Sequence, residues 1–147
     1  MLHYYVDPGA AAPAYRQLME QVRYYVASGA VEVGEKLPSI RALARYLGVN
    51  PSTVVKAYGE LEHLGVIERR QGSGVFVREG GAVPTAEECE AALRGRARAL
   101  AIEARQMGAA DQLVIGLLRE ELGALGTTGT AGEAGQAKDE TTNGDQR

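Results

Sequence analysis

The chain has 147 residues, 45% of them apolar, which fits one domain with a small appendage and excludes a large multidomain enzyme. Its single cysteine, Cys89, excludes an intramolecular disulfide and a cysteine-based zinc cage, and the lack of a long apolar run or a secretion signal predicts a cytoplasmic protein without a membrane span. Sixteen basic and 19 acidic residues give a net charge of −3, which is not typical of a uniformly basic nucleic-acid binder.

Two helices are predicted in the first third of the chain. Apolar residues recur at helical spacing from Tyr15 to Val26, and Ser28-Gly29 ends that helix. Residues 33–38 are predicted to be a loop. Ser39 then caps a helix of about two turns, which Gly48 stops.

A third helix and a hairpin follow. The helix spans residues 51–64, with Asn50 as its N-cap and a proline in its first position. Two β-rich runs, residues 66–70 and 75–77, flank a turn over residues 71–74. Two helices joined by a short turn and followed by a hairpin are the order of a winged helix-turn-helix.

The chain continues with a linker over residues 80–84 and two amphipathic helices. Thr85 and Glu88 form a capping-box sequence at the start of the first, and the second runs from about residue 109 to 122. Two helices alone have too little core, so their apolar faces need a partner, most simply a second copy of the chain. The predicted dimerisation residues are Leu93, Leu100, Met107, Leu113, Val114, Leu117 and Leu118.

These patterns divide the chain into four parts and predict a mainly α fold with a small β-hairpin. Residues 1–79 form a winged helix-turn-helix, residues 80–84 a linker, and residues 85–125 a helical dimerisation region. Residues 126–147 contain no Leu, Ile, Val or aromatic side chain, so this tail is predicted to be disordered.

The region from residue 36 to 78 has the charge of a surface that faces a polyanion. It contains seven Lys and Arg residues against three Glu, a local charge of +4, whereas residues 81–147 contain seven cations against eleven anions, a charge of −4. Because charges more than about 8–10 Å apart are screened at physiological salt, this local distribution matters more than the total.

Candidate DNA contacts come from two helices and the hairpin. The start of the second helix of a helix-turn-helix enters the major groove, where Ser52, Thr53 and Lys56 can bond bases or phosphates. Arg41 and Arg45 on the preceding helix are placed to reach the same strand, and the hairpin tip with its flanking arginines fits a minor groove. The predicted DNA-contacting residues are Arg41, Arg45, Asn50, Pro51, Ser52, Thr53, Lys56, Arg69, Arg70, Gly72, Ser73 and Gly74.

Structural roles compete with binding for several of these residues. Asn50 is favoured as a helix cap over a DNA ligand, and Tyr58 is interpreted as a core residue with its hydroxyl at the surface. Taken alone, Arg69 and Arg70 fit a solvated strand edge as well as a DNA contact.

No catalytic residue, metal site or cofactor is predicted. No nucleophile–base pair stands out, and His3 and His63 lie far apart without a carboxylate or cysteine cluster. Cys89 is interpreted as a small apolar filler of the helical seam.

Several motifs, in order and at matching spacing, resemble the DNA-binding domain of GntR-superfamily transcriptional regulators. They are Pro-Ala-Tyr-Arg-Gln-Leu at residues 13–18, Leu-Pro-Ser-Ile-Arg at 37–41, Leu-Gly-Val-Asn-Pro-Ser-Thr-Val-Val-Lys-Ala-Tyr at 47–58, and Gly-Ser-Gly-Val-Phe-Val at 72–77. The resemblance covers about residues 5–78.

The resemblance implies that Arg41, residues 51–53 with Lys56 behind them, and Gly72 contact operator DNA. Many relatives have arginine at the positions of Pro51 and Val55, so this chain presents a smaller and less basic helix to the bases. The remaining part is too short for the effector or aminotransferase-like domains of the larger subfamilies. It is similar to the short YtrA-like subfamily, whose two C-terminal helices make the dimer interface.

The chain is therefore predicted to be a repressor that binds a pseudo-palindromic double-stranded operator as a homodimer, through a recognition helix over residues 51–64 and a wing over residues 66–78. The alternative is a winged helix used for protein–protein contact, in which the positively charged region meets an acidic partner. Whether a small-molecule effector exists stays open.

Overall fold

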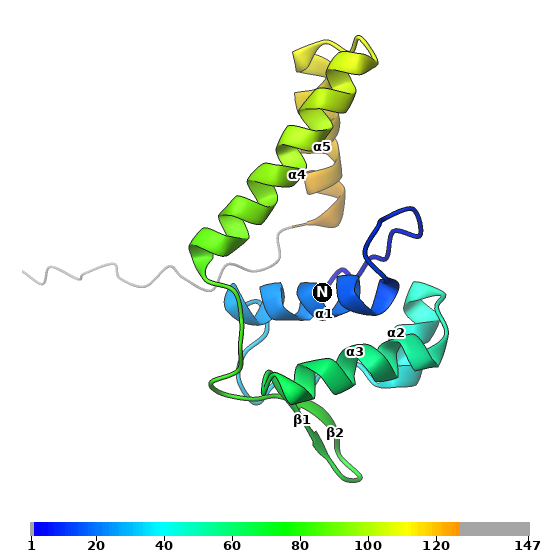
Figure 1. The fold of residues 1–147 in the computed structure, drawn as a ribbon, viewed down its shortest axis with the longest axis vertical. Coiled ribbons are helices and arrows are strands. Elements are labelled where there is room, and N and C mark those ends of the chain that lie inside the picture. Colours follow the sequence, from blue (N-terminus) through cyan, green and yellow to red (C-terminus); the bar gives the residue numbers. More distant parts are fainter. Residues whose placement is uncertain (1, 127–147) are drawn as a thin grey trace, which may run out of the picture.

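The fold is mainly helical, as predicted, with one antiparallel hairpin. The computed structural model describes residues 2–126, so all but Gly126 of the predicted disordered tail lies outside the described residues. The elements are α1 (Ala14–Ala27), α2 (Ile40–Leu47), α3 (Pro51–His63), β1 (Ile67–Arg70), β2 (Gly74–Val77), α4 (Ala86–Gln106) and α5 (Asp111–Leu125) (Figure 1). None of the helices in residues 2–126 combines the length and apolarity needed to cross a bilayer.

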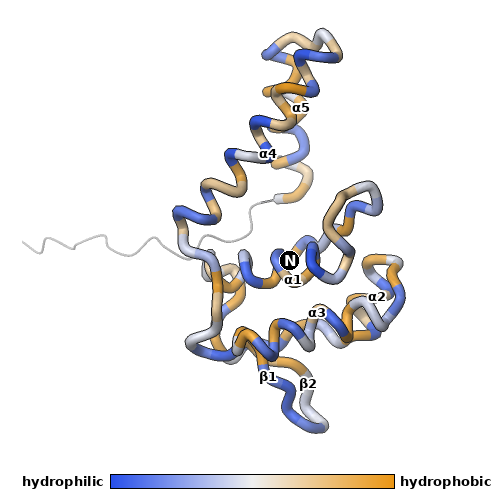
Figure 2. Tube along the Cα trace, in the orientation of Figure 1, coloured by the Kyte–Doolittle hydropathy of each residue, from blue (hydrophilic) through white to orange (hydrophobic). Residues whose placement is uncertain are grey.

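One apolar core lies between α1, α2, α3 and the hairpin. The helical spacing of the sequence places one face of each helix inside, and the fully buried side chains include Leu18, Val22, Leu43, Val54 and Leu61. The hairpin closes the core with Val66, Ile67, Val75 and Val77. The hairpin changes from apolar at its base to hydrophilic at its tip (Figure 2), which leaves the tip free to project into solvent.

The predicted caps fix where α2 and α3 begin and end. The Ser39 hydroxyl accepts a hydrogen bond from the Ala42 amide at 3.2 Å, and Asn50 Oδ1 accepts one from the Ser52 amide at 2.9 Å. Gly48 ends α2 with φ +65°, a left-handed conformation that favours glycine. The turn between the two helices is thus specified by residues within it.

Residues 33–38 differ from the predicted simple loop, because their backbone pairs with β2. The Leu37 amide donates to the Val75 carbonyl at 2.9 Å, and the Val77 amide donates to the Glu35 carbonyl at 2.9 Å. Lys36 lies opposite Phe76 in a single antiparallel bridge. The two segments are far apart in sequence, so the local residue pattern of neither one predicts this pairing.

Tyr58 is a core residue, as expected, but the expected position of its hydroxyl at the surface is wrong. The residue is 0% exposed, and its hydroxyl donates a hydrogen bond to the Pro38 carbonyl at 2.8 Å. Burial raises the pKa of this hydroxyl above its ordinary value, so it stays a donor. The bond ties α3 to the segment that enters α2.

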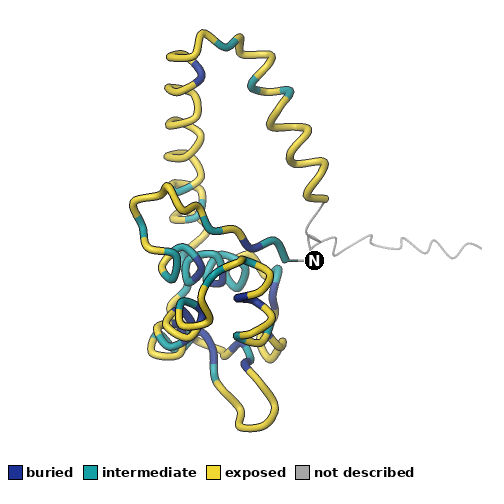
Figure 3. The backbone as a smooth tube through the Cα atoms, turned by 90° about the vertical axis from the view of Figure 1, so that its right-hand side faces the viewer, coloured by how far each residue is buried: buried dark blue, intermediate teal, exposed yellow. Residues whose placement is uncertain are grey.

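The helices α4 and α5 form an arm outside this core. Thr85 and Glu88 make the predicted capping box at its start, and Gly108 turns the chain with φ +69°. The two helices diverge from that turn and are exposed along most of their length (Figure 3). Six of the seven predicted dimerisation residues are exposed and Val114 is half-buried, so residues 2–126 of one copy leave the apolar faces of the arm uncovered.

The segment between the hairpin and the arm lies against the winged helix. The Ala82 amide donates to the Leu64 carbonyl at 3.1 Å, and Arg23 Nε donates to the Ala82 carbonyl at 2.8 Å. Val83 packs on the core. Although predicted as a linker, this segment is tied to the body at several points.

Candidate nucleic-acid interface

The predicted DNA-contacting residues lie on α2, the start of α3 and the hairpin. The helices α2 and α3 pack against each other, and the hairpin follows α3 after the turn at Gly65. The hairpin and the arm project from opposite sides of the three-helix body (Figure 1). The hairpin is therefore free of the arm and can approach a large ligand.

Arg41 and Arg45 are the exposed cations of α2. Ser39 caps the helix, so Arg41 lies in its first turn, and Arg45 lies in its last turn, where a cation complements the helix dipole. Within residues 2–126, no carboxylate lies within 4 Å of either guanidinium. Their charge is not neutralised and is available to phosphate.

The start of α3 presents small side chains to solvent. Pro51 and Ser52 are exposed and Thr53 is half-buried. The side-chain oxygen of Asn50 is engaged in the cap, as the structural interpretation favoured. Val55, one helical turn from the start, is 45% exposed, although the other large apolar residues of this helix point inward.

Lys56 lies against α1, which the sequence did not indicate. Its Nζ atom is 3.9 Å from the centroid of the Tyr15 ring, within the range of a cation–π contact. The charge stays exposed, but its position is set by a residue of the first helix. A nucleic acid that binds the start of α3 would meet Lys56 at the α1 side of this surface.

The wing tip is exposed and built from glycine. Gly72 has φ +74° and Gly74 has φ +124°, conformations that other residues rarely adopt. Ser73 lies between them in the exposed turn. A side chain at Gly74 would also collide with Lys36, whose Cε atom is 2.7 Å from the position of an added Cβ. The tip is therefore compact enough for close approach to a groove.

The two predicted wing arginines are partly neutralised. Arg69 pairs with Glu62 at 3.4 Å, and Arg70 pairs with Glu68 at 2.7 Å. The four side chains are 39–53% exposed, so each pair is weak and can exchange for a phosphate.

Lys36 is a wing cation that sequence reasoning missed. Its Nζ is 5.9 Å from the centroid of the Phe76 ring, and the Arg70 guanidinium lies 4.5 Å from the same ring. Phe76 thus gathers two cations on the hairpin. Lys36 contributes to the local charge of residues 36–78, but only the pairing of its loop with β2 brings it to the wing.

The described residues offer little for metal binding or acid–base chemistry. Across residues 2–126, no three His, Cys, Asp or Glu side chains gather as a metal site would require. The two groups there with clearly shifted pKa are Tyr4 and Tyr58, and burial raises the pKa of both.

Comparisons with known proteins agree with this geometry. A family model described as bacterial regulatory proteins, gntR family, matches residues 14–77. The HTH-type transcriptional repressor YtrA of Bacillus subtilis (strain 168) is 35% identical over 103 residues, which are 70% of this chain and 79% of YtrA. The uncharacterized HTH-type transcriptional regulator YhcF of the same strain is 39% identical over 70 residues, 48% of this chain and 58% of YhcF.

A solved structure supports the fold. The crystal structure of a transcriptional antiterminator from Listeria monocytogenes EGD-e is 27% identical, covers 88% of this chain and 98% of its own, and superposes with a TM-score of 0.53. The two sequence relatives are named as transcriptional regulators, in agreement with the prediction that the chain is not an enzyme. The chain belongs to the GntR family of bacterial regulatory proteins and is a winged-helix, DNA-binding transcriptional regulator.

Proposed function

We propose that this chain is a homodimeric repressor that binds a pseudo-palindromic operator through α3 and the wing. The observation that supports it best is the surface formed by Arg41 and Arg45 beside the exposed start of α3. Here two cations that no carboxylate of residues 2–126 neutralises adjoin small hydroxyl-bearing side chains. Cations give affinity for phosphate, and small polar side chains at a helix start suit base edges.

In this proposal the start of α3 lies in the major groove. Ser52 and Thr53 donate or accept hydrogen bonds at base edges, and Lys56 and Arg41 contact phosphate or guanine. The exposed methyl groups of Val55 suit the C5-methyl group of thymine. We therefore expect a preference for thymine near the centre of each half-site.

The wing contacts the adjacent minor groove in the same proposal. The glycine tip allows the backbone to approach the sugar–phosphate walls, and Lys36, Arg69 and Arg70 follow the phosphates. The weak ion pairs of the two arginines exchange for phosphate contacts on binding, so part of their charge still contributes.

In this proposal the arm joins the chain to a second copy of itself. Its exposed apolar faces need a partner, and a symmetric pair of arms presents two recognition helices to one face of the duplex. Half-sites about 10 base pairs apart, or a multiple of that, then match successive turns. The similarity to YtrA, which is named a repressor, supports the repressor assignment.

Selection of bound sequences from a random duplex pool tests this function. We expect an inverted repeat to emerge, with binding that weakens steeply as salt rises because phosphate contacts release counterions. Random DNA should compete poorly against the selected duplex. If no sequence is enriched and an acidic protein binds the same surface instead, the chain is a protein–protein module, the second candidate.

Arg41→Ala is expected to lower affinity for the selected operator by about 5- to 150-fold, equivalent to about 1–3 kcal/mol, with the fold intact. Lys56→Ala is expected to cause a loss of affinity in the same range. Arg94→Ala is the matched control, because Arg94 is an exposed arginine on α4 that pairs with Glu90 at 2.6 Å. Fluorescence anisotropy titrations measure the effect. Unchanged affinity in both Arg41→Ala and Lys56→Ala contradicts the assigned contact surface.

A further inference from the structure

We propose that Tyr15 positions Lys56 for a backbone phosphate at the edge of the major groove. This inference rests on the proposed function, because it assigns a role within the same DNA-contacting surface. The Lys56 Nζ atom lies 3.9 Å from the centroid of the Tyr15 ring. A cation this close to an aromatic ring is attracted by the negative charge of the ring face. Tyr15 is therefore a positioning residue that acts through Lys56 without touching DNA itself.

The Tyr15 ring is anchored to the core. Tyr15 is the second residue of α1, is half-buried, and packs against the buried side chains of the winged helix. The backbone that enters α1 is fixed by Gln17, whose Nε2 atom donates hydrogen bonds to the Ala12 carbonyl at 2.8 Å and to the Asp7 carbonyl at 2.9 Å. The ring therefore offers a fixed face, to which the flexible side chain of Lys56 adapts.

Among residues 2–126, no carboxylate competes with the ring for Lys56. Glu60 follows Lys56 by four positions on α3, a spacing at which two side chains can meet. The two charged groups do not approach within 4 Å, and a lysine that precedes its glutamate is the weaker order for such a pair. The first turn of α1 contains no acidic residue either. The ring thus orients the ammonium group without neutralising it.

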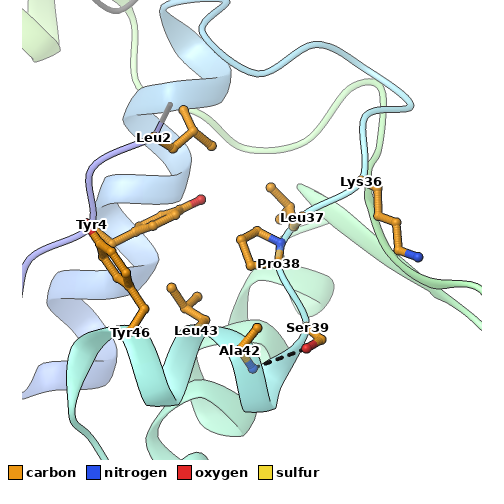
Figure 4. Close-up of a pocket in the computed structure, with 9 residues that line it drawn as sticks. All are labelled: Leu2, Tyr4, Lys36, Leu37, Pro38, Ser39, Ala42, Leu43 and Tyr46. Carbon is orange, nitrogen blue, oxygen red and sulfur yellow. Dashed lines mark hydrogen bonds between the residues drawn. The ribbon is translucent and has the colours of Figure 1, made fainter. Parts of the chain in front are cut away.

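A second lysine near an aromatic ring, Lys36, is held less closely. Its Nζ atom is 5.9 Å from the centroid of the Phe76 ring, and the Arg70 guanidinium shares that ring at 4.5 Å. Figure 4 shows the Lys36 side chain extending away from Leu37 and Pro38. Within residues 2–126, by contrast, Tyr15 has Lys56 as its one cationic neighbour. A change of Tyr15 therefore reports on a single cation.

The direction of the Lys56 side chain favours a phosphate over a base. Ser52 and Lys56 are both exposed and share one face of α3, because they are four residues apart. Ser52 lies in the first turn, which reaches the base edges in a helix-turn-helix, whereas the Lys56 side chain extends sideways to α1. A lysine ammonium is a compact point charge that binds phosphate without bidentate geometry. Because the ring already restricts this side chain, less rotamer freedom is lost on binding.

A double-mutant cycle, measured by fluorescence anisotropy on the selected operator, tests the positioning role. Tyr15→Leu removes the ring face and is expected to weaken binding about two- to fivefold, the effect of a cation–π contact at an exposed site. Tyr15→Phe keeps the ring and should recover most of that loss. In the Lys56→Ala background, Tyr15→Leu should cause no further loss, because no ammonium group is left to orient.

Two further measurements test the phosphate contact and the ring contact separately. Lys56→Ala should reduce the slope of log affinity against log salt by about 0.9, the value for one phosphate, and should weaken the selected operator and a random duplex by a similar factor. In NMR spectra of the free chain, the ring current of Tyr15 should shift the Lys56 ε-methylene protons upfield. That shift should persist in Tyr15→Phe and disappear in Tyr15→Leu.

The inference is overturned if Tyr15→Phe loses as much affinity as Tyr15→Leu, since the hydroxyl would then contact DNA directly. Equal losses from Tyr15→Leu with and without Lys56 also overturn it, as does a Lys56→Ala loss confined to the selected operator. Arg41→Ala separates this inference from the proposed function. If Arg41→Ala and Lys56→Ala both bind like the wild type, the proposed contact surface fails and the inference fails with it. If both weaken binding while Tyr15→Leu does not, the inference alone fails.

Discussion

Leu117→Glu is expected to convert the proposed dimer to a monomer and to lower operator affinity by at least about 100-fold. Leu117 is 53% exposed on α5 and lines an apolar hollow of about 280 Å³ between α4 and α5, together with Leu100, Met107 and Leu118. A carboxylate placed in such a seam loses its water without gaining a partner, which strongly disfavours association. Losing the second copy also removes the gain from binding two half-sites at once.

Analytical ultracentrifugation measures the oligomeric state, and anisotropy on the selected operator measures the affinity. Arg119→Glu is the matched control, because it adds an acid to the same helix at an exposed position two residues away, on the other side of α5. This control should remain a dimer. A chain truncated before Thr85 should also sediment as a monomer with weak DNA binding. A dimer that survives both the substitution and the truncation would place the interface elsewhere.

Gly81→Ala is expected to lower the free energy of unfolding of the winged helix by about 2–3 kcal/mol. An added Cβ would lie 2.5 Å from the Val66 Cα and 2.7 Å from the Gly65 carbonyl oxygen. Both are backbone atoms, so no side-chain rotation relieves the clash. The segment must move off the body, which breaks the hydrogen bonds of Ala82 to Leu64 and Arg23.

Gly59→Ala is the control for this substitution. Gly59 lies inside α3, and an added Cβ there meets nothing within 4 Å. Alanine should therefore stabilise the helix by about 0.5–1 kcal/mol. Urea denaturation followed by circular dichroism compares the two variants. Equal stability of Gly81→Ala and the wild type would show that the segment between the hairpin and the arm moves without cost. That segment would then not fix the arm to the winged helix.

The orientation of the arm relative to the winged helix depends on the segment between the hairpin and the arm. The Arg96 guanidinium of α4 lies 5.8 Å from the centroid of the Tyr24 ring, which is a contact between the arm and α1. This contact and the hydrogen bonds of Ala82 together set the direction in which α4 leaves the winged helix. In the proposed symmetric dimer, the spacing of the two α3 helices follows from that direction.

Local chemistry determined the helices, the turns and the hairpin from the sequence alone. Ser39, Asn50 and Thr85 each accept a hydrogen bond from an amide two or three residues ahead, so the cap and its partner lie in one short stretch. The φ of Gly48 and the apolar spacing of the helices are local in the same sense. The family motifs are also runs of adjacent residues, which is why the fold class and the family could be predicted correctly.

Only the tertiary structure decided which distant residues meet. Lys36 reaches the wing because its loop pairs with β2, Lys56 rests on Tyr15 of α1, and Arg69 pairs with Glu62. The burial of the Tyr58 and Tyr4 hydroxyls likewise depends on how separate segments pack. Such contacts are set by the shape of the assembled core and not by neighbours along the chain, so no local pattern encodes them.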